Sequence, residues 1–201
     1  MTDSLHQRLR TAAAQLGSEP VALSHLADLH GSGTRGALLV LLSAPSVLPV
    51  PGVGNVLGIG LLLLALAIWR GQPGHTLPAR VAGWQLSAPW ARRVLGLLAG
   101  VYATASRWAR MRWLHLVDGP QAWLAPKIGL MGGLIFLPIP FGNVLPALAL
   151  SLLGLGLVFR DGLAVLLALL AGGAAVAYTA VLGLLAWQWG LAPLLQWLQP
   201  A

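Results

Sequence analysis

One proline-containing motif occurs twice in this sequence, about ninety residues apart. It reads LPVPGVGNVL at residues 48–57 and LPIPFGNVL at residues 137–145. Each copy interrupts a long apolar run, and the apolar run that follows it ends in arginine. A segment duplicated in this way indicates two units with the same fold. In membrane proteins, such units place their broken helices next to each other.

The composition excludes an ordinary soluble domain. Only 8% of the 201 residues are charged and 57% are hydrophobic, whereas soluble domains carry roughly 25% charged residues. The sequence therefore predicts an all-α integral membrane protein. The net charge of +7 comes from basic residues that flank apolar segments, a pattern typical of cytoplasmic anchors near anionic lipid. We expect no nucleic-acid partner.

Residues 1–33 have a more polar character, and we expect a cytoplasmic or interfacial pair of amphipathic helices there. The first helix is predicted over 4–16, ended by Gly17, and the second is predicted to open at 18–20 and to run to His30. No apolar stretch follows the early charges, so a cleavable signal peptide is not predicted. The N-terminus is therefore expected in the cytoplasm.

The first predicted unit is 34–126, and it contains a helical hairpin over 35–70. Its two arms are 36–48 and 56–69. At 1.5 Å per residue each arm is roughly 20 Å long. That is short of the ~30 Å hydrocarbon core of a bilayer.

The second predicted unit is 127–201, with a hairpin over 127–160. Its arms, 128–137 and 144–159, have lengths of about 15 and 24 Å. Arms this short favour re-entrant hairpins, which enter and leave the bilayer on one side. The alternative is a pair of ordinary spanning helices joined by a proline turn.

The two hairpins begin and end at cations, which the positive-inside rule places in the cytoplasm. These cations are Arg35, Arg70, Lys127 and Arg160. Between the hairpins, residues 94–106 fit either an interfacial amphipathic helix or a short span. An even number of crossings there would leave the units parallel, and an odd number would invert them. Residues 163–190 predict a transmembrane helix with a tryptophan-rich outer end.

The breaks are the candidate substrate-binding site. Prolines leave backbone carbonyls without partners, and Asn55 and Asn143 are placed to cap the following arms with their side chains. Pro146 falls in the first turn of its arm, where the missing N–H costs little. The candidate residues are Pro49, Pro51, Asn55, Pro138, Pro140, Asn143, Pro146, Arg35, Arg70 and Arg160. The simpler alternative is two tight turns with arginine anchors, and Asp161 then serves as part of an Arg-Asp-Gly helix stop.

Several chemistries are disfavoured. The hairpin arms contain no ionisable residue, which argues against a proton relay. Ser43, Ser46 and Ser151 have no histidine or acid near them in the sequence, so nucleophilic catalysis has no support. The five histidines show no metal-binding spacing, and there are no cysteines. We expect a non-enzymatic protein without a metal or cofactor.

Several motifs resemble those of the ExoD family of exopolysaccharide-synthesis membrane proteins, over about residues 20–190. They are the glycine-rich entry with Gly31, Gly33, Arg35 and Gly36, the prolines Pro45, Pro49 and Pro51, then Gly71, Leu77 and Pro78, and the segments 137–147 and 156–162. The chain departs from the family at Ala67, where glutamine is expected, and in a shifted basic run at Arg107, Arg110 and Arg112. The resemblance implies a multi-pass bacterial inner-membrane protein of exopolysaccharide production.

Two functions follow as hypotheses. The first is a transporter-like protein that handles a lipid-linked or anionic intermediate at the paired breaks. The alternative is a non-catalytic scaffold or regulator of the synthesis machinery. The expected partners are membrane lipids, a lipid-linked saccharide or phosphate-bearing lipid, and polysaccharide-synthesis proteins or a second copy of the chain.

Overall fold

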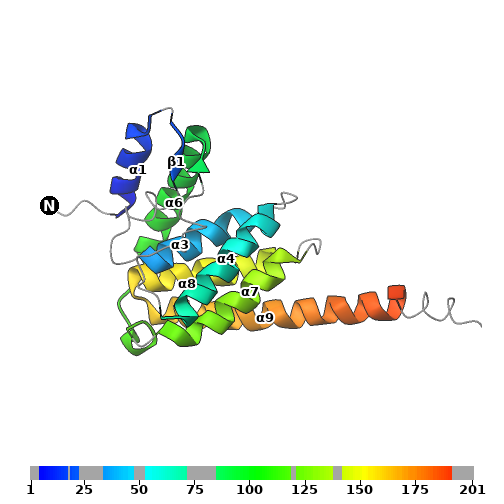
Figure 1. Cartoon of the computed structure of the whole chain (residues 1–201). Coiled ribbons are helices and arrows are strands. Elements are labelled where there is room, and N and C mark those ends of the chain that lie inside the picture. The colour runs from blue at the N-terminus through cyan, green and yellow to red at the C-terminus, as the bar shows by residue number, and fades with distance from the viewer. Residues whose placement is uncertain are drawn as a thin grey trace, which may run out of the picture.

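The fold is a small bundle of short helices crossed at one end by a helix pair (Figure 1). The computed structural model describes residues 5–17, 19–22, 34–47, 53–71, 85–118, 121–137 and 142–191. The bundle consists of α3 (Thr34–Ser43), α4 (Val53–Trp69), α7 (Ala125–Phe136), α8 (Val144–Phe159) and α9 (Gly162–Ala186). The predicted all-α class is confirmed. The break prolines Pro49, Pro51, Pro138 and Pro140 lie outside the described residues.

Short 3₁₀ segments extend or join the helices. They are η2 (Ala44–Val47), which prolongs α3, η3 (Leu114–Leu116) and η4 (Gln121–Leu124). The arms of both hairpins therefore have nearly their predicted lengths. The second arm of the second hairpin, α8, has the predicted bounds.

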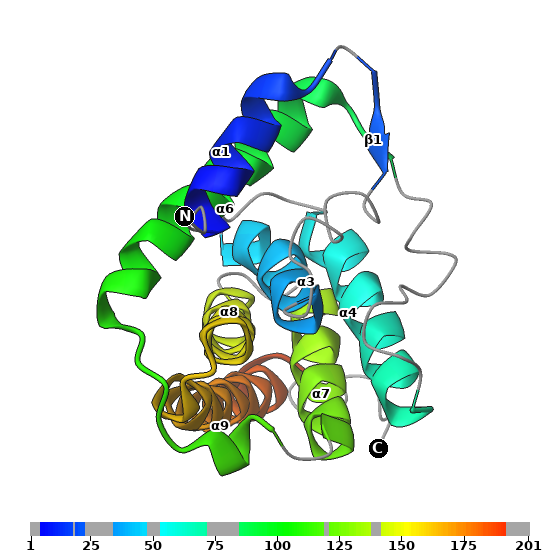
Figure 2. The same cartoon turned by 90° about the vertical axis from the view of Figure 1, so that its left-hand side faces the viewer.

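Each hairpin packs mainly against the other hairpin. α3 lies along α8, and α4 lies along α7 (Figure 2). A Cβ atom added to Gly36 or to Gly154 would lie 2.5 Å from the other residue's carbonyl oxygen. A Cβ atom added to Gly132 would lie 2.9 Å from the Cβ of Leu61. The two backbones of each pair thus approach at positions where only glycine fits, and these positions fix the helix pairs in antiparallel orientation.

Both hairpins point the same way. The first turns of α3 and α7 and the last turns of α4 and α8 lie together at one end of the bundle (Figure 1). We call this the foot end, and the opposite end, next to the two breaks, the tip end. α4 ends and α7 begins at the foot end, so the two hairpins are parallel in the structure.

Helices α1 (Leu5–Gln15) and α6 (Ala88–Trp108) pack together across the foot end (Figure 1). The buried side of α6 follows a helical period through Ala91, Leu95, Leu98 and Tyr102. Its other residues include the exposed Arg92, whose guanidinium donates to the carbonyl oxygens at 16 and 17. α6 is therefore amphipathic and includes residues 94–106, for which the interfacial helix and the short span both stay predictions.

The prediction of a second N-terminal helix is wrong at the start of that helix. Val21 and Ala22 form a short strand, β1 (Val21–Ala22), which pairs antiparallel with β2 (Gln85–Leu86). The local signal at 18–20 is overridden because backbone hydrogen bonds to the segment before α6 hold these residues extended. The rest of the predicted helix lies outside the described residues.

The C-terminal helix is present as predicted. α9 continues into a π-helical turn, η5 (Trp187–Leu191), and within the described residues Gly162–Trp189 is the stretch long and apolar enough to cross a membrane. It packs antiparallel to α8 at first. Its last buried residue in the described range is Ala175, and beyond that point the helix projects from the bundle (Figure 1).

A buried carboxylate holds the turn between α8 and α9. Arg160 ends α8 in the left-handed conformation, with φ 55°, and Asp161 then caps α9 by accepting from the N–H of Leu163 at 3.0 Å. Asp161 is also bound by Arg112, whose Nε and Nη2 donate at 2.8 and 3.0 Å. The Arg112 hydrogen bonds hold the pKa of Asp161 below its usual value. The predicted Arg-Asp-Gly helix stop therefore has this additional partner.

The close glycine contacts can be tested with neighbouring substitutions. Gly132→Ala forces Cβ against Leu61 and should cost about 1–3 kcal/mol of stability. Gly133→Ala meets nothing within 4 Å and should be neutral or stabilising by up to about 1 kcal/mol, because alanine is the better helix former. Unfolding of the purified proteins in mixed detergent measures both. Equal stabilities of the two variants would contradict the packing described.

The Arg112–Asp161 pair predicts a pH-dependent stability. Asp161→Asn should lower the thermal midpoint at pH 7. Because the folded pKa is depressed, the carboxylate contributes fully above its unfolded value of about 3.9 and progressively less as pH falls towards the lower folded value. The difference in thermal midpoint between wild type and Asp161→Asn should therefore shrink as the pH falls from about 5 to about 3.

The matched control for this experiment is Asp118→Asn. Asp118 pairs with Arg160, but both side chains are about half exposed, 47% and 48%, so the pair should contribute little. A decrease in thermal midpoint of Asp161→Asn that does not depend on pH would contradict a stabilising role of the Arg112–Asp161 pair. An equal decrease in Asp118→Asn would contradict it as well.

Candidate functional site

The structure brings the two glycine-asparagine pairs of the repeated motif together at the tip end. A Cβ atom added to Gly54 of the first hairpin would collide with Nδ2 of Asn143 of the second, and would lie 3.2 Å from the carbonyl oxygen of Ile135. Asn55 Nδ2 donates to the carbonyl oxygen of Phe136 at 3.2 Å. Two segments that lie about ninety residues apart in the sequence thus form one contact region.

The predicted capping role of both asparagines is wrong. α4 begins at Val53, two residues before Asn55, so Asn55 lies inside the helix and its amide binds the last carbonyl of α7. Such carbonyls have no partner within their own helix. Asn143 does occupy the N-cap position of α8, but its side chain makes no capping hydrogen bond. Its backbone is αR, with φ −78° and ψ −21°, which is unlike the extended conformation of a capping residue.

Asn143 keeps an unused acceptor. Its Oδ1 is buried and has no hydrogen-bond partner among the described residues. A buried polar atom without a partner costs about 1–3 kcal/mol. Pro146, as predicted, sits in the first turn of α8, and it is buried. Beside the break, the Asn143 side chain therefore has an Oδ1 without a partner among the described residues and does not cap the N-terminus of α8.

The serines predicted to be inert form a polar contact deep between α3 and α8. Ser43 Oγ donates to the carbonyl oxygen of Leu39 at 2.6 Å and lies 2.9 Å from Ser151 Oγ. Ser46 Oγ contacts the carbonyl oxygen of Leu42 at 3.4 Å. The Ser43–Ser151 contact joins α3 to α8, whereas Ser43 and Ser46 also bond to carbonyls four residues back in their own segment.

The candidate cations lie at the foot end, away from the breaks. Arg35 is the second residue of α3, Arg70 follows α4, and Arg160 follows α8. Arg160 and Asn143 flank α8, whose 16 residues make it about 24 Å long. Arg160 forms an ion pair with Asp118. The structure describes six of the ten candidate residues and separates them into a tip group, Asn55, Asn143 and Pro146, and a foot group, Arg35, Arg70 and Arg160.

The cation Lys127 is also engaged at the foot end. Its Nζ lies 4.7 Å from the centre of the Trp123 ring, and it donates to the carbonyl oxygen of the same residue at 3.5 Å. It is therefore fixed to its own helix start.

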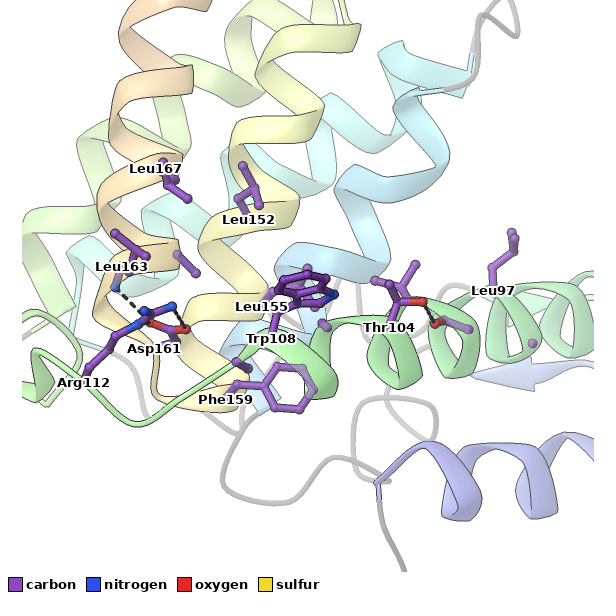
Figure 3. A pocket seen from close by; sticks show the side chains of 16 residues that line it. Leu97, Thr104, Trp108, Arg112, Leu152, Leu155, Phe159, Asp161, Leu163 and Leu167 are labelled. Carbon is purple, nitrogen blue, oxygen red and sulfur yellow. Dashed lines mark hydrogen bonds and ion pairs between the residues drawn. The ribbon is translucent and has the colours of Figure 1, made fainter.

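A groove that sequence reasoning did not find lies between α6, α8 and α9 (Figure 3). Its volume is about 690 Å³. Apolar side chains from the three helices line it, with the Arg112–Asp161 pair at one end. One signal was present in the sequence: Gly96 and Gly100 lie on the side of α6 that is not buried, where they leave space beside the neighbouring helices.

Comparisons with known proteins agree with the motifs. Residues 5–181 match the family described as "Exopolysaccharide synthesis, ExoD". The chain is 33% identical to "Protein ExoD" of Rhizobium meliloti over 165 residues, which cover 75% of this chain and 66% of that protein. It is 26% identical to an uncharacterized protein of Synechocystis sp. over 144 residues, which cover 64% of this chain and 62% of that protein.

The matched segments span slightly less than two thirds of each of these two relatives. No solved structure is significantly similar to the chain. The family match over most of the sequence confirms what the repeated motif and the Arg-Asp-Gly segment indicated: the chain belongs to the ExoD family, which is implicated in exopolysaccharide synthesis.

Proposed function

We propose that this chain is a multi-pass protein of the bacterial inner membrane that binds a lipid-linked, anionic intermediate of exopolysaccharide synthesis or export where its two helix breaks meet. The protein acts as a transporter-like binder and performs no covalent chemistry. Its hairpins are re-entrant, with their feet and the N-terminus on the cytoplasmic side.

The apolar surface supports a membrane position. Large apolar side chains on the outward side of α9 are well exposed, among them Leu170 at 63% and Leu184 at 62%. α9 has 25 residues and is about 38 Å long, enough to cross a hydrocarbon core of ~30 Å. Lipid around this helix would remove the cost of exposing these side chains to water.

The depth of the bundle supports re-entrant hairpins. α9 has buried residues only from Gly162 to Ala175, which is about 21 Å of helix. If α9 crosses the whole bilayer, the hairpin tips reach roughly two thirds of the way through the hydrocarbon core. Irregular backbone at that depth must be enclosed by protein or line a wet cavity. The close approach of the two breaks is a means of enclosing it.

The observation that carries the proposal is the buried Oδ1 of Asn143, which has no partner in the described part of the chain. It is an acceptor suited to a sugar hydroxyl. Beside it, the N-terminus of α8 has no side-chain cap, and free N–H groups at a helix start attract anions such as phosphate. A saccharide attached to a phosphate-bearing lipid carries both chemical groups.

Asn143→Leu tests this site. If Oδ1 is reserved for a ligand, the variant should fold with wild-type or greater stability, because an unsatisfied polar atom is removed. Export of exopolysaccharide by a deletion strain that expresses it should fall about tenfold or more, as expected for loss of a hydrogen bond to a charged or polar ligand. Asn55→Leu is the matched control. It should lose stability, because the Phe136 carbonyl loses its donor.

Normal export from a stable Asn143→Leu protein would refute a binding role at the breaks. If that protein also co-purified with a glycosyltransferase, the alternative role as a scaffold or regulator would replace the proposed binding role.

The role of the foot-end cations needs a separate substitution. Arg160→Gly removes the guanidinium and keeps the left-handed φ that glycine adopts freely. If Arg160 attracts the anionic intermediate, export should fall while the protein elutes and melts normally. Asp118→Asn, which frees Arg160 from its ion pair, should leave export unchanged or raise it. Unchanged export in Arg160→Gly would restrict the site to the tip group.

A further inference from the structure

The groove between α6, α8 and α9 is a second candidate binding site, remote from the breaks. α6 contributes Leu97 and Val101 to one wall, and α8 and α9 contribute Leu152, Leu155, Leu163 and Leu167 to the other. Figure 3 shows the apolar side chains on both sides and the Arg112–Asp161 pair at one end. The volume of about 690 Å³ is in the range of small-molecule sites, ≈ 300–1,000 Å³.

The groove lies where an amphipathic helix crosses the foot end of the apolar bundle. Under the membrane position proposed above, this is the level at which lipid headgroups meet acyl chains. The apolar part of the groove extends from there along α8 and α9. An occupant with an apolar chain and a polar head would therefore match the groove in direction as well as in character.

The charges at the polar end of the groove determine whether an anionic or a cationic head group would bind there. Asp161 is neutralised by Arg112, whose side chain stays 39% exposed. Arg107 and Arg110 flank the lining residues Trp108 and Ala109 and are exposed. Three arginines against one paired carboxylate leave this end cationic, and polybasic clusters at the membrane surface attract anionic lipid.

We propose that this groove binds one acyl chain of an anionic phospholipid from the surrounding bilayer, with the phosphate headgroup at Arg107, Arg110 and the exposed side of Arg112. The inference uses the membrane position of the proposed function but is independent of the tip site. A lipid held here would fasten the α1–α6 pair to the bundle, because it contacts α6 on one side and α8 and α9 on the other.

Filling the groove provides the first test. A Cβ atom added to Gly100 meets nothing within 4 Å, so Gly100→Phe should fold and place its ring in the groove. Gly173→Phe is the matched control, on an exposed and equally open glycine of α9 that does not line the groove. Native mass spectrometry of the purified proteins with added phosphatidylglycerol should show bound lipid in wild type and Gly173→Phe, and little or none in Gly100→Phe.

Removing the charge provides the second test. Arg107→Gln with Arg110→Gln should cut the preference for phosphatidylglycerol over phosphatidylcholine by about fivefold for each arginine. Arg8→Gln with Arg10→Gln, on the exposed surface of α1, makes the same change in net charge and should leave the preference intact.

Three results would overturn the proposal: no preference for phosphatidylglycerol in wild type, undiminished lipid binding by Gly100→Phe, or occupation of the groove by a second copy of the chain in cross-linking of Leu97→Cys. Loss of lipid binding in Gly100→Phe together with normal export would support this proposal. It would also show that lipid binding in the groove is independent of the function of the breaks. Asn143→Leu, conversely, should bind phosphatidylglycerol as wild type does.

Discussion

Close backbone contact between the two hairpins is the interaction on which the fold depends. Gly36 against Gly154 and Gly58 against Gly132 allow α3 to lie on α8 and α4 on α7 at distances that no side chain would permit. In the membrane position that we propose, packing of this kind would replace the hydrophobic driving force that holds soluble bundles together. The crossed pairing also brings Gly54 next to Asn143, so that the described residues beside the two breaks are in contact.

The foot end completes this arrangement with polar interactions. Asp161 connects the start of α9 to Arg112 and to the backbone at Arg110, so the long helix, the end of α8 and the segment after α6 share one fixed point. The amphipathic pair α1–α6 lies along one edge of the bundle there, beside α3 and α8 (Figure 2). The molecule is therefore polar and cationic at the foot end, and apolar along the length of α9.

The helices of the bundle could be predicted because each is an apolar run that has a proline motif or a charged residue at one end at least. That signal gave α8 within a residue and placed Pro146 correctly. The groove and the β1–β2 pairing could not be predicted, since they arise from contacts between segments distant in the sequence. The Asn55 cap was mispredicted because the local pattern does not include the carbonyl of Phe136, which binds the Asn55 amide. Asn143 does occupy the N-cap position, but in its αR backbone conformation its side chain makes no capping hydrogen bond. Asp161 was identified as a helix stop, but Arg112, 49 positions away, offered no local sign of partnership.

Labelling of single cysteines tests the central claim, that the hairpins turn inside the membrane, and the chain has no native cysteine. Val56→Cys and Leu137→Cys lie at the tip end, where the native side chains are exposed on the protein surface, at 54% and 43%. Intact cells treated with an impermeant maleimide should label Trp187→Cys, and permeabilised cells should label Arg70→Cys in addition. Positions 56 and 137 should stay unlabelled in both, because lipid covers them. Labelling of either tip from the periplasm as fast as position 187 would contradict the re-entrant arrangement.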